Sequence, residues 1–271
     1  MDDMLLMRNK VACGRVVGRS HIATSTPCQD YVAARNSRGV GCIALADGAG
    51  SRAHSELGAQ EAVKATLRIL SRDFDELYTL ASSDNFSVAS RVIAACHRAL
   101  KKKAQTLSVD IGTLACTLMF AAHKNGRYLA GHLGDGIIAM ETSPGVVEVL
   151  SRPDNGEFAN TTVFVTELDA ASRFRIYAGA HSAPAFAVMS DGTAESLYMR
   201  SSGQPAQALQ KLLQWNRELS KTKMQNILGA NLEQVFARKT TDDCSIGLLS
   251  IPATQPISQL EYIAVPVAPN N

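Results

Sequence analysis

The stretch CIALADGAG, residues 42–50, joins a short apolar run to an Asp-Gly pair. The run has the composition of a buried strand, and the Asp47 carboxylate stands at its end, where the strand fixes the backbone. Gly48 then lets the chain turn sharply away. The stretch therefore predicts a strand that presents one carboxylate at the edge of a sheet.

Similar acidic landmarks recur along the chain. Apolar runs precede two of them, RYLAGHL at 127–133 and AFAVM at 185–189, and CSIGLL at 244–249 follows the last. Several such strand ends, if they converge, would make an all-oxygen site suited to Mg²⁺ or Mn²⁺. In chain order the landmarks are Gln29-Asp30, Asp47-Gly48, Asp135-Gly136, Asp191-Gly192 and Asp242-Asp243.

Composition is that of an ordinary globular protein. The 271 residues are 46% hydrophobic and 19% charged, and 27 Lys and Arg nearly balance 25 Asp and Glu. The KKK run at 101–103 resembles a solvated helix end, so we expect neither a nucleic-acid nor a membrane partner, while the oligomeric state stays open. Six scattered cysteines without a CxxC pair favour a reducing compartment. The N-terminus MDDMLLMRNK lacks signal-peptide features, and a cytoplasmic location is the expectation.

Hydrophobic periodicity predicts strands, two helices, many strands, two helices and a last strand. The helices are expected at 53–70, 86–103, 205–219 and 223–237. This grouping favours an α+β fold of two antiparallel sheets, each covered by a helix pair. We expect one domain over residues 8–250 and a Pro-containing C-terminal tail over 251–271. The expected strands are 11–18, 31–36, 39–46, 112–122, 126–140, 145–151, 161–166, 174–180, 185–190 and 244–250.

The order QD, DGAG, GT, GDG, SDG and DDxS resembles the metal-dependent serine/threonine phosphatases of the type 2C (PPM) family. The PCQD form of the first motif is most similar to the bacterial branch. The resemblance covers roughly residues 10–250. It implies a four-layer αββα sandwich with the metals between the two sheets at one edge.

The resemblance implies a role for each acidic landmark in a two-ion core. Asp47 resembles the carboxylate that bridges both ions, and Gly48 the residue that offers its backbone carbonyl. Asp191 resembles a direct ligand of the first ion, and we expect Asp47 and Asp191 to be the catalytic pair. Asp242 is favoured as the last ligand by its place in the motif, with Asp243 as the alternative.

Two further positions follow from the same resemblance. Asp30 resembles the acidic residue of the first motif, at or near the first ion. Asp135, together with Asp191, resembles a looser site for a third ion. The expected cofactors are therefore two Mg²⁺ or Mn²⁺ ions and a weaker third.

Such a site would hydrolyse phosphoserine and phosphothreonine on proteins without a protein nucleophile. Two ions sharing a carboxylate lower the pKa of a bridging water and supply hydroxide near neutral pH. That hydroxide would attack the phosphate in line while the ions neutralise the developing charge.

The chain departs from the family pattern where the substrate phosphate binds. Ser25 stands where the family usually carries a phosphate-binding Arg, and Gln29 stands in place of Glu. Arg52, then Arg19 and His21, are the candidates for the missing positive charge. Two rivals to the phosphoprotein phosphatase remain: a phosphatase-like phosphoprotein-binding or regulatory domain with weak or no turnover, and an enzyme acting on small phosphate esters. Retention of every carboxylate favours the enzyme, because a decayed site has no need of mutually repelling charges.

Overall fold

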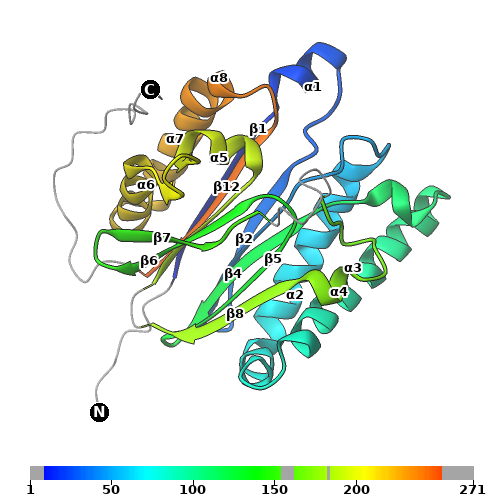
Figure 1. Cartoon of the computed structure of the whole chain (residues 1–271), viewed down its shortest axis with the longest axis horizontal. Coiled ribbons are helices and arrows are strands. Elements are labelled where there is room, and N and C mark those ends of the chain that lie inside the picture. Colours follow the sequence, from blue (N-terminus) through cyan, green and yellow to red (C-terminus); the bar gives the residue numbers. More distant parts are fainter. Residues whose placement is uncertain (1–8, 154–161, 182–183, 252–271) are drawn as a thin grey trace.

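The computed structural model describes residues 9–153, 162–181 and 184–251, and two five-stranded antiparallel sheets lie face to face at its centre (Figure 1). The predicted C-terminal tail lies, apart from residue 251, outside the described residues, as does residue 8. One sheet has the order β2 (Tyr31–Ser37), β3 (Val40–Ala46), β4 (Leu118–Lys124), β5 (Arg127–Leu133) and β8 (Arg175–Ala180). The other has the order β1 (Lys10–Val16), β12 (Cys244–Ser250), β9 (Ala185–Met189), β6 (Ile137–Ser143) and β7 (Val146–Ser151).

Helices cover the outer face of each sheet. The long pair α2 (Ser55–Ala81) and α3 (Asn85–Leu107) packs on the β3 sheet, and α6 (Gln207–Glu218) and α7 (Lys221–Asn231) pack on the β12 sheet. The α+β prediction and the four-layer αββα arrangement are confirmed. The smaller elements are α1 (Arg19–Thr24), the 3₁₀ turn Ile111–Leu114, α4 (Ala170–Arg173), α5 (Asp191–Leu197), the hairpin β10 (Tyr198–Met199) and β11 (Gln204–Pro205), the π turn Leu232–Phe236 and α8 (Ala237–Lys239).

The apolar run of β3 is buried on both faces, which explains why its sequence does not alternate. Cys42 and Ala44 face the α2 and α3 helices, whereas Ile43 and Leu45 face the opposite sheet. Successive strand side chains point to opposite faces, so a strand between two layers must be apolar throughout. The middle layer between the sheets also contains Phe186 from β9.

Three strand predictions are wrong in extent. The predicted strand 126–140 is divided by a bend at residues 134–136 into β5 and β6. Within the predicted strand 112–122, a 3₁₀ turn forms first and β4 begins only at Leu118. The turn packs directly on α2, where a Cβ at Gly58 would lie 1.9 Å from the Leu114 carbonyl oxygen. The predicted strand 161–166 is not a strand over its described residues; its Val165 N–H donates to the Cys116 carbonyl at 2.8 Å. In the last two of these segments, non-strand backbone packs against the end of the sheet where the acidic landmarks lie.

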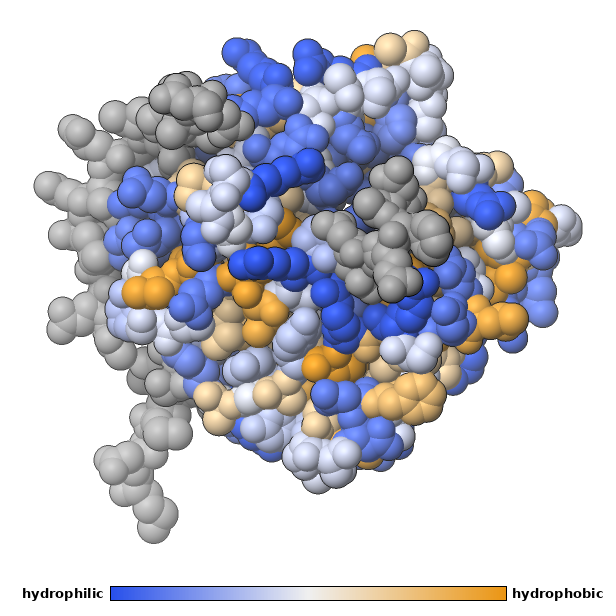
Figure 2. Space-filling view, viewed as in Figure 1, coloured by the Kyte–Doolittle hydropathy of each residue, from blue (hydrophilic) through white to orange (hydrophobic). Residues whose placement is uncertain are grey.

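On the face seen in Figure 2, polar residues predominate and apolar side chains form small separate groups. Within the part of the chain that the structure describes, no helix is both long enough and apolar enough to cross a membrane.

Candidate metal centre

A pocket of about 370 Å³ opens at one end of the two sheets, where the acidic landmarks meet. Both sheets contribute to it: Asp47 follows β3, Asp135 joins β5 to β6, Asp191 follows β9, and Asp242 precedes β12. Strand ends far apart in sequence are thus brought to one place. The lining residues are Ser20, His21, Gln29, Asp47, Gly48, Gly50, Thr117, Asp135, Thr162, Phe164, Asp191, Thr241 and Asp242.

Asp47 lies at the centre of this carboxylate group. Thr117 fixes its backbone, because the Thr117 hydroxyl accepts the Asp47 N–H at 2.9 Å and the Thr117 N–H donates to the Asp47 carbonyl at 2.8 Å. Burial raises the pKa of Asp47 well above its usual range, and the negative charges of four other carboxylates raise it further. Those four belong to Asp30, Asp191, Asp135 and Asp242.

Asp30 is buried beneath the pocket, with 1% of its surface exposed. Among the described residues, neither of its carboxylate oxygens has a partner in hydrogen-bonding geometry, although the hydroxyls of Ser190 and Ser245 lie near enough to oppose part of its pKa shift. Burial still raises the pKa of Asp30 to about 6. Burying a carboxylate that makes no hydrogen bond costs free energy, and a bound cation would offset that cost.

Asp191 also lines the pocket, and its pKa is raised for the same physical reasons. Burial raises its pKa to about 7, and the carboxylates of Asp242, Asp135 and Asp30 add to the effect. Its backbone position is set by α5, which begins at Asp191 directly after β9. The helix is favoured here because its first-turn acid lies at the positive end of the helix dipole.

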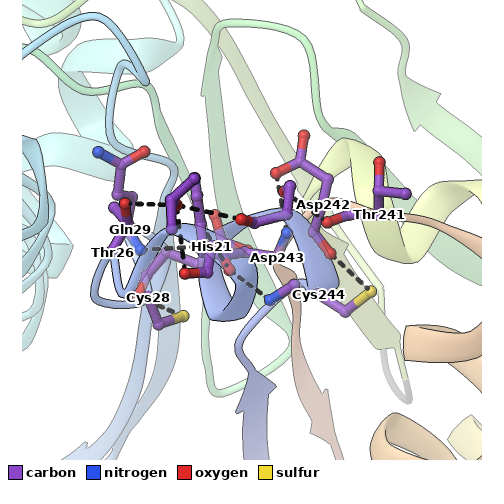
Figure 3. A network of polar contacts seen from close by, with 12 residues as sticks. His21, Thr26, Cys28, Gln29, Thr241, Asp242, Asp243 and Cys244 are labelled. Carbon is purple, nitrogen blue, oxygen red and sulfur yellow. Dashed lines mark hydrogen bonds and ion pairs between the residues drawn. The ribbon is translucent and has the colours of Figure 1, made fainter.

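The adjacent acids Asp242 and Asp243 have different surroundings (Figure 3). Asp242 lines the pocket. Asp243 is 2% exposed, and its two carboxylate oxygens accept the backbone N–H groups of Gly18 and Gln29, each at 2.6 Å. Asp243 thereby ties together the segments before α1, β2 and β12.

His21 contacts the same carboxylate. Its Nδ1 atom lies 3.0 Å from Oδ1 of Asp243, an ion pair when the imidazole is protonated, although the angle is not that of a hydrogen bond. The helix α1 that carries His21 is anchored to the loop before β12, since the Ser20 N–H and hydroxyl both donate to the Thr241 carbonyl, at 3.0 and 2.6 Å. Gly18 is required at this junction, because a Cβ would lie 2.3 Å from the Asp242 carbonyl carbon.

The predicted phosphate-binding cations are placed differently from one another. His21 lines the pocket. Arg19 does not, and its guanidinium donates to the Thr240 carbonyl at 3.0 and 3.2 Å. Arg52 is exposed in the turn between β3 and α2, outside the pocket lining.

Sequence reasoning missed the hydroxyl and aromatic residues of the pocket. The Thr162 hydroxyl donates to Oδ2 of Asp135 at 2.7 Å, and Phe164 forms an apolar part of the wall. Both lie in the run that was predicted to be a strand, and no local signal distinguishes a threonine that orients a carboxylate from one in a sheet. Thr117 was hidden in the same way, inside a predicted strand.

Among the described residues, no three His, Cys, Asp or Glu side chains already stand at the spacing of a closed metal cage. Burial raises the pKa of Asp47 and of Asp191, and the charges of the neighbouring carboxylates raise both further.

Comparison with known proteins gives the same picture from independent information. The chain is 28% identical over 183 residues to serine/threonine-protein phosphatase 3 of Escherichia coli, covering 65% of this chain and 70% of that one. The fold matches the Mycobacterium tuberculosis phosphatase PstP/Ppp with a TM-score of 0.62 and 15% identity over 91% of this chain and 100% of that one. It also matches PppA of Pseudomonas aeruginosa with a TM-score of 0.60 and 16% identity over 90% and 98%.

The family model for protein phosphatase 2C matches residues 17–233. That range begins just before α1 and includes every carboxylate of the pocket except Asp242. The chain therefore belongs to the protein phosphatase 2C family, the metal-dependent protein serine/threonine phosphatases.

Proposed function

We propose that the pocket holds two Mg²⁺ or Mn²⁺ ions and hydrolyses phosphoserine and phosphothreonine in proteins. In this proposal the Asp47 carboxylate would bind both ions, and the Gly48 carbonyl would complete the coordination of one ion. Asp191 and Asp242 would bind the first ion. Asp30 lies beside that ion, and Asp135 with Asp191 offers a weaker third position.

The observation that carries the proposal is the buried carboxylate of Asp30, whose two oxygens have no partner in hydrogen-bonding geometry among the described residues. Asp47, surrounded by four other carboxylates, adds a second reason, because burial of so many like charges is unfavourable without a cation. Carboxylate and carbonyl oxygens are the ligands that Mg²⁺ and Mn²⁺ prefer. A solved structure of the catalytic domain of the serine threonine protein phosphatase PstP, which has the same fold, is a complex with 2 manganese ions, and this supports a two-ion site in this chain.

The bound ions would supply Lewis acidity that activates water and neutralises charge on the phosphoryl oxygens. The residues of the chain position the components. Thr117 fixes the backbone of Asp47, and Thr162 orients the Asp135 carboxylate. Asp243 binds no ion in this proposal; its two backbone hydrogen bonds hold Gln29 at the pocket wall.

The substrate phosphate needs a positive group besides the ions. His21 is at the pocket wall, where its Nδ1 atom lies 3.0 Å from the Asp243 carboxylate. Arg52 has an exposed side chain, and we keep it as the second candidate because only the 48–51 turn separates it from Asp47. The relation to the Escherichia coli phosphatase supports phosphoprotein as the substrate class.

A single set of measurements tests the proposal. Hydrolysis of p-nitrophenyl phosphate and of a phosphothreonine peptide is followed with added Mn²⁺, with Mg²⁺ and after exhaustive EDTA treatment. Calorimetric titration of Mn²⁺ into the EDTA-treated protein, beside Asp47→Asn, counts the ions without relying on activity. We expect activity to require the metal and two tight ions in the wild type only. Full activity after EDTA, or two tight ions in Asp47→Asn, would rule out the proposed site.

A further inference from the structure

A groove of about 340 Å³ lies between α2 and β2, apart from the metal pocket. It is lined by Ala34, Arg35, Lys64, Leu67 and Arg68, and shares no residue with the pocket. Three of these five side chains are cationic and none is acidic. We call this set of residues the basic groove.

The guanidinium groups of the basic groove are free to bind an anion. Arg35 and Arg68 are both exposed, and neither side chain has a hydrogen bond or ion pair with another residue that the structure describes. Lys64 is 3.7 Å from Glu61, a long contact one helical turn away on a side chain that is 41% exposed. Such a contact contributes little and does not neutralise the groove.

Helix stability does not explain these cations. Lys64, Arg68 and Arg72 follow one another at four-residue spacing on α2, so each is a like-charged neighbour of the next. Like charges at this spacing weaken a helix by a few tenths of a kcal/mol per pair. Arg72 is paired with Asp73, at 2.7 Å, which leaves Lys64 and Arg68 beside Arg35. The whole chain carries 27 basic and 25 acidic residues, so this concentration of charge is local.

Both walls of the groove start at the metal pocket. On β2, Arg35 lies five residues beyond Asp30, roughly 17 Å along an extended strand. On α2, Lys64 and Arg68 lie 9 and 13 residues beyond Ser55, roughly 14 and 20 Å along a helix axis. The two elements pack side by side, so the two routes agree on a separation of roughly 15 to 20 Å. An extended peptide spans that distance in roughly five or six residues.

We propose that the basic groove binds an acidic, extended segment of the phosphoprotein substrate, five or six residues from the phosphorylated side chain. The proposal rests on the phosphatase function proposed above. Asp and Glu carboxylates of the segment pair with the Arg35 and Arg68 forks, the geometry for which guanidinium groups are suited. Leu67 and Ala34 provide an apolar surface that the CH₂ groups of the bound Asp and Glu side chains contact. The groove thereby gives different KM values to phosphoproteins that the metal pocket alone would hydrolyse with the same KM.

The test compares three proteins on matched peptides. The variant Arg35→Gln/Arg68→Gln removes two charges from the groove, and Lys101→Gln/Lys102→Gln removes two from exposed positions on α3. Phosphothreonine peptides carry four Glu five to eight residues from the phosphate, on one side or the other, and the matched peptides carry four Gln. We expect the wild type to show a KM about five- to tenfold lower for one acidic peptide than for its Gln form. In the groove variant this ratio should fall below about twofold, with p-nitrophenyl phosphate hydrolysis unchanged.

Three results would overturn the inference. One is an unaltered KM ratio in the groove variant, and the second is an equal loss in the α3 control. The third is measured by fluorescence anisotropy at one salt concentration. It is tighter binding to the groove by a single-stranded RNA than by the unphosphorylated acidic peptide of equal charge. The anisotropy measurement needs no turnover. If no phosphate ester is hydrolysed while the acidic peptide binds and the groove variant releases it, the proposed function fails and the binding site stands.

Discussion

Replacing Asp191 by Asn should make the metal-free protein more stable at pH 8, although it removes a predicted metal ligand. Burial, with the carboxylates of Asp242, Asp135 and Asp30, raises the Asp191 pKa from 3.8 to about 7. Each unit of pKa difference between folded and unfolded states corresponds to about 1.4 kcal/mol, so the shift sets an upper limit of about 4 kcal/mol. Asparagine has nearly the same shape and carries no charge to bury.

The sign of the pH dependence follows from the direction of the shift. A raised acid pKa means that the folded protein binds the proton more tightly than the unfolded chain does. The stability that protonation supports is therefore complete below about pH 4 and is lost as the pH rises through about 7. The advantage of Asp191→Asn should be near zero at pH 4 and greatest at pH 8.

Urea unfolding in EDTA at pH 4, 6 and 8 measures this difference, with exposed Asp169 changed to Asn as a charge-matched control. Added Mn²⁺ should reverse the order, because an ion that binds only the folded state stabilises the wild type in proportion to its affinity. The reasoning is refuted if Asp191→Asn is no more stable than the wild type at pH 8 in EDTA, or if its advantage does not shrink toward pH 4.

Four other substitutions separate the roles in the pocket. Asp47→Asn should abolish nearly all turnover with the fold retained, checked by initial rates and circular dichroism; wild-type rates at moderate Mn²⁺ would contradict its central place. Asp135→Ala should lower turnover while calorimetry still finds two tight ions, and loss of both ions would make it a core ligand. Asp243→Asn should lower the free energy of unfolding by about 2 to 4 kcal/mol, because it removes a charge-assisted hydrogen bond from a backbone N–H. An unchanged urea midpoint would contradict this role of Asp243. Arg52→Ala should raise KM for aryl phosphate several-fold at unchanged metal affinity, and unaltered KM and kcat would leave Arg52 a solvated side chain.

Local sequence predicts most strands of this fold because the rule behind them is local. Where both faces of a strand are covered, as on β3, the run is apolar throughout and easily recognised. The helix predicted over 53–70 is too short, because the polar pair Arg72-Asp73 interrupts the pattern. In the structure α2 bends at Asp73, where φ is −117° and ψ is 19°, and then continues with buried Phe74 and Leu77. Tertiary packing beyond the bend keeps the helix going, and a local window does not contain that information.

The metal centre is less predictable, because its side chains are oriented by partners far away in the sequence. Asp242 and Asp243 have the same chemistry and adjacent positions, in the bend that precedes β12. The motif resemblance favours Asp242 as the metal ligand, but the residue types by themselves give no physical reason to choose between the two. The structure favours Asp242 at the pocket because Asp243 finds two backbone donors elsewhere, at Gly18 and Gln29, 225 and 214 residues earlier in the chain. A motif thus predicts which residue types gather at a site, whereas the fold decides which carboxylate faces the pocket and which holds its wall.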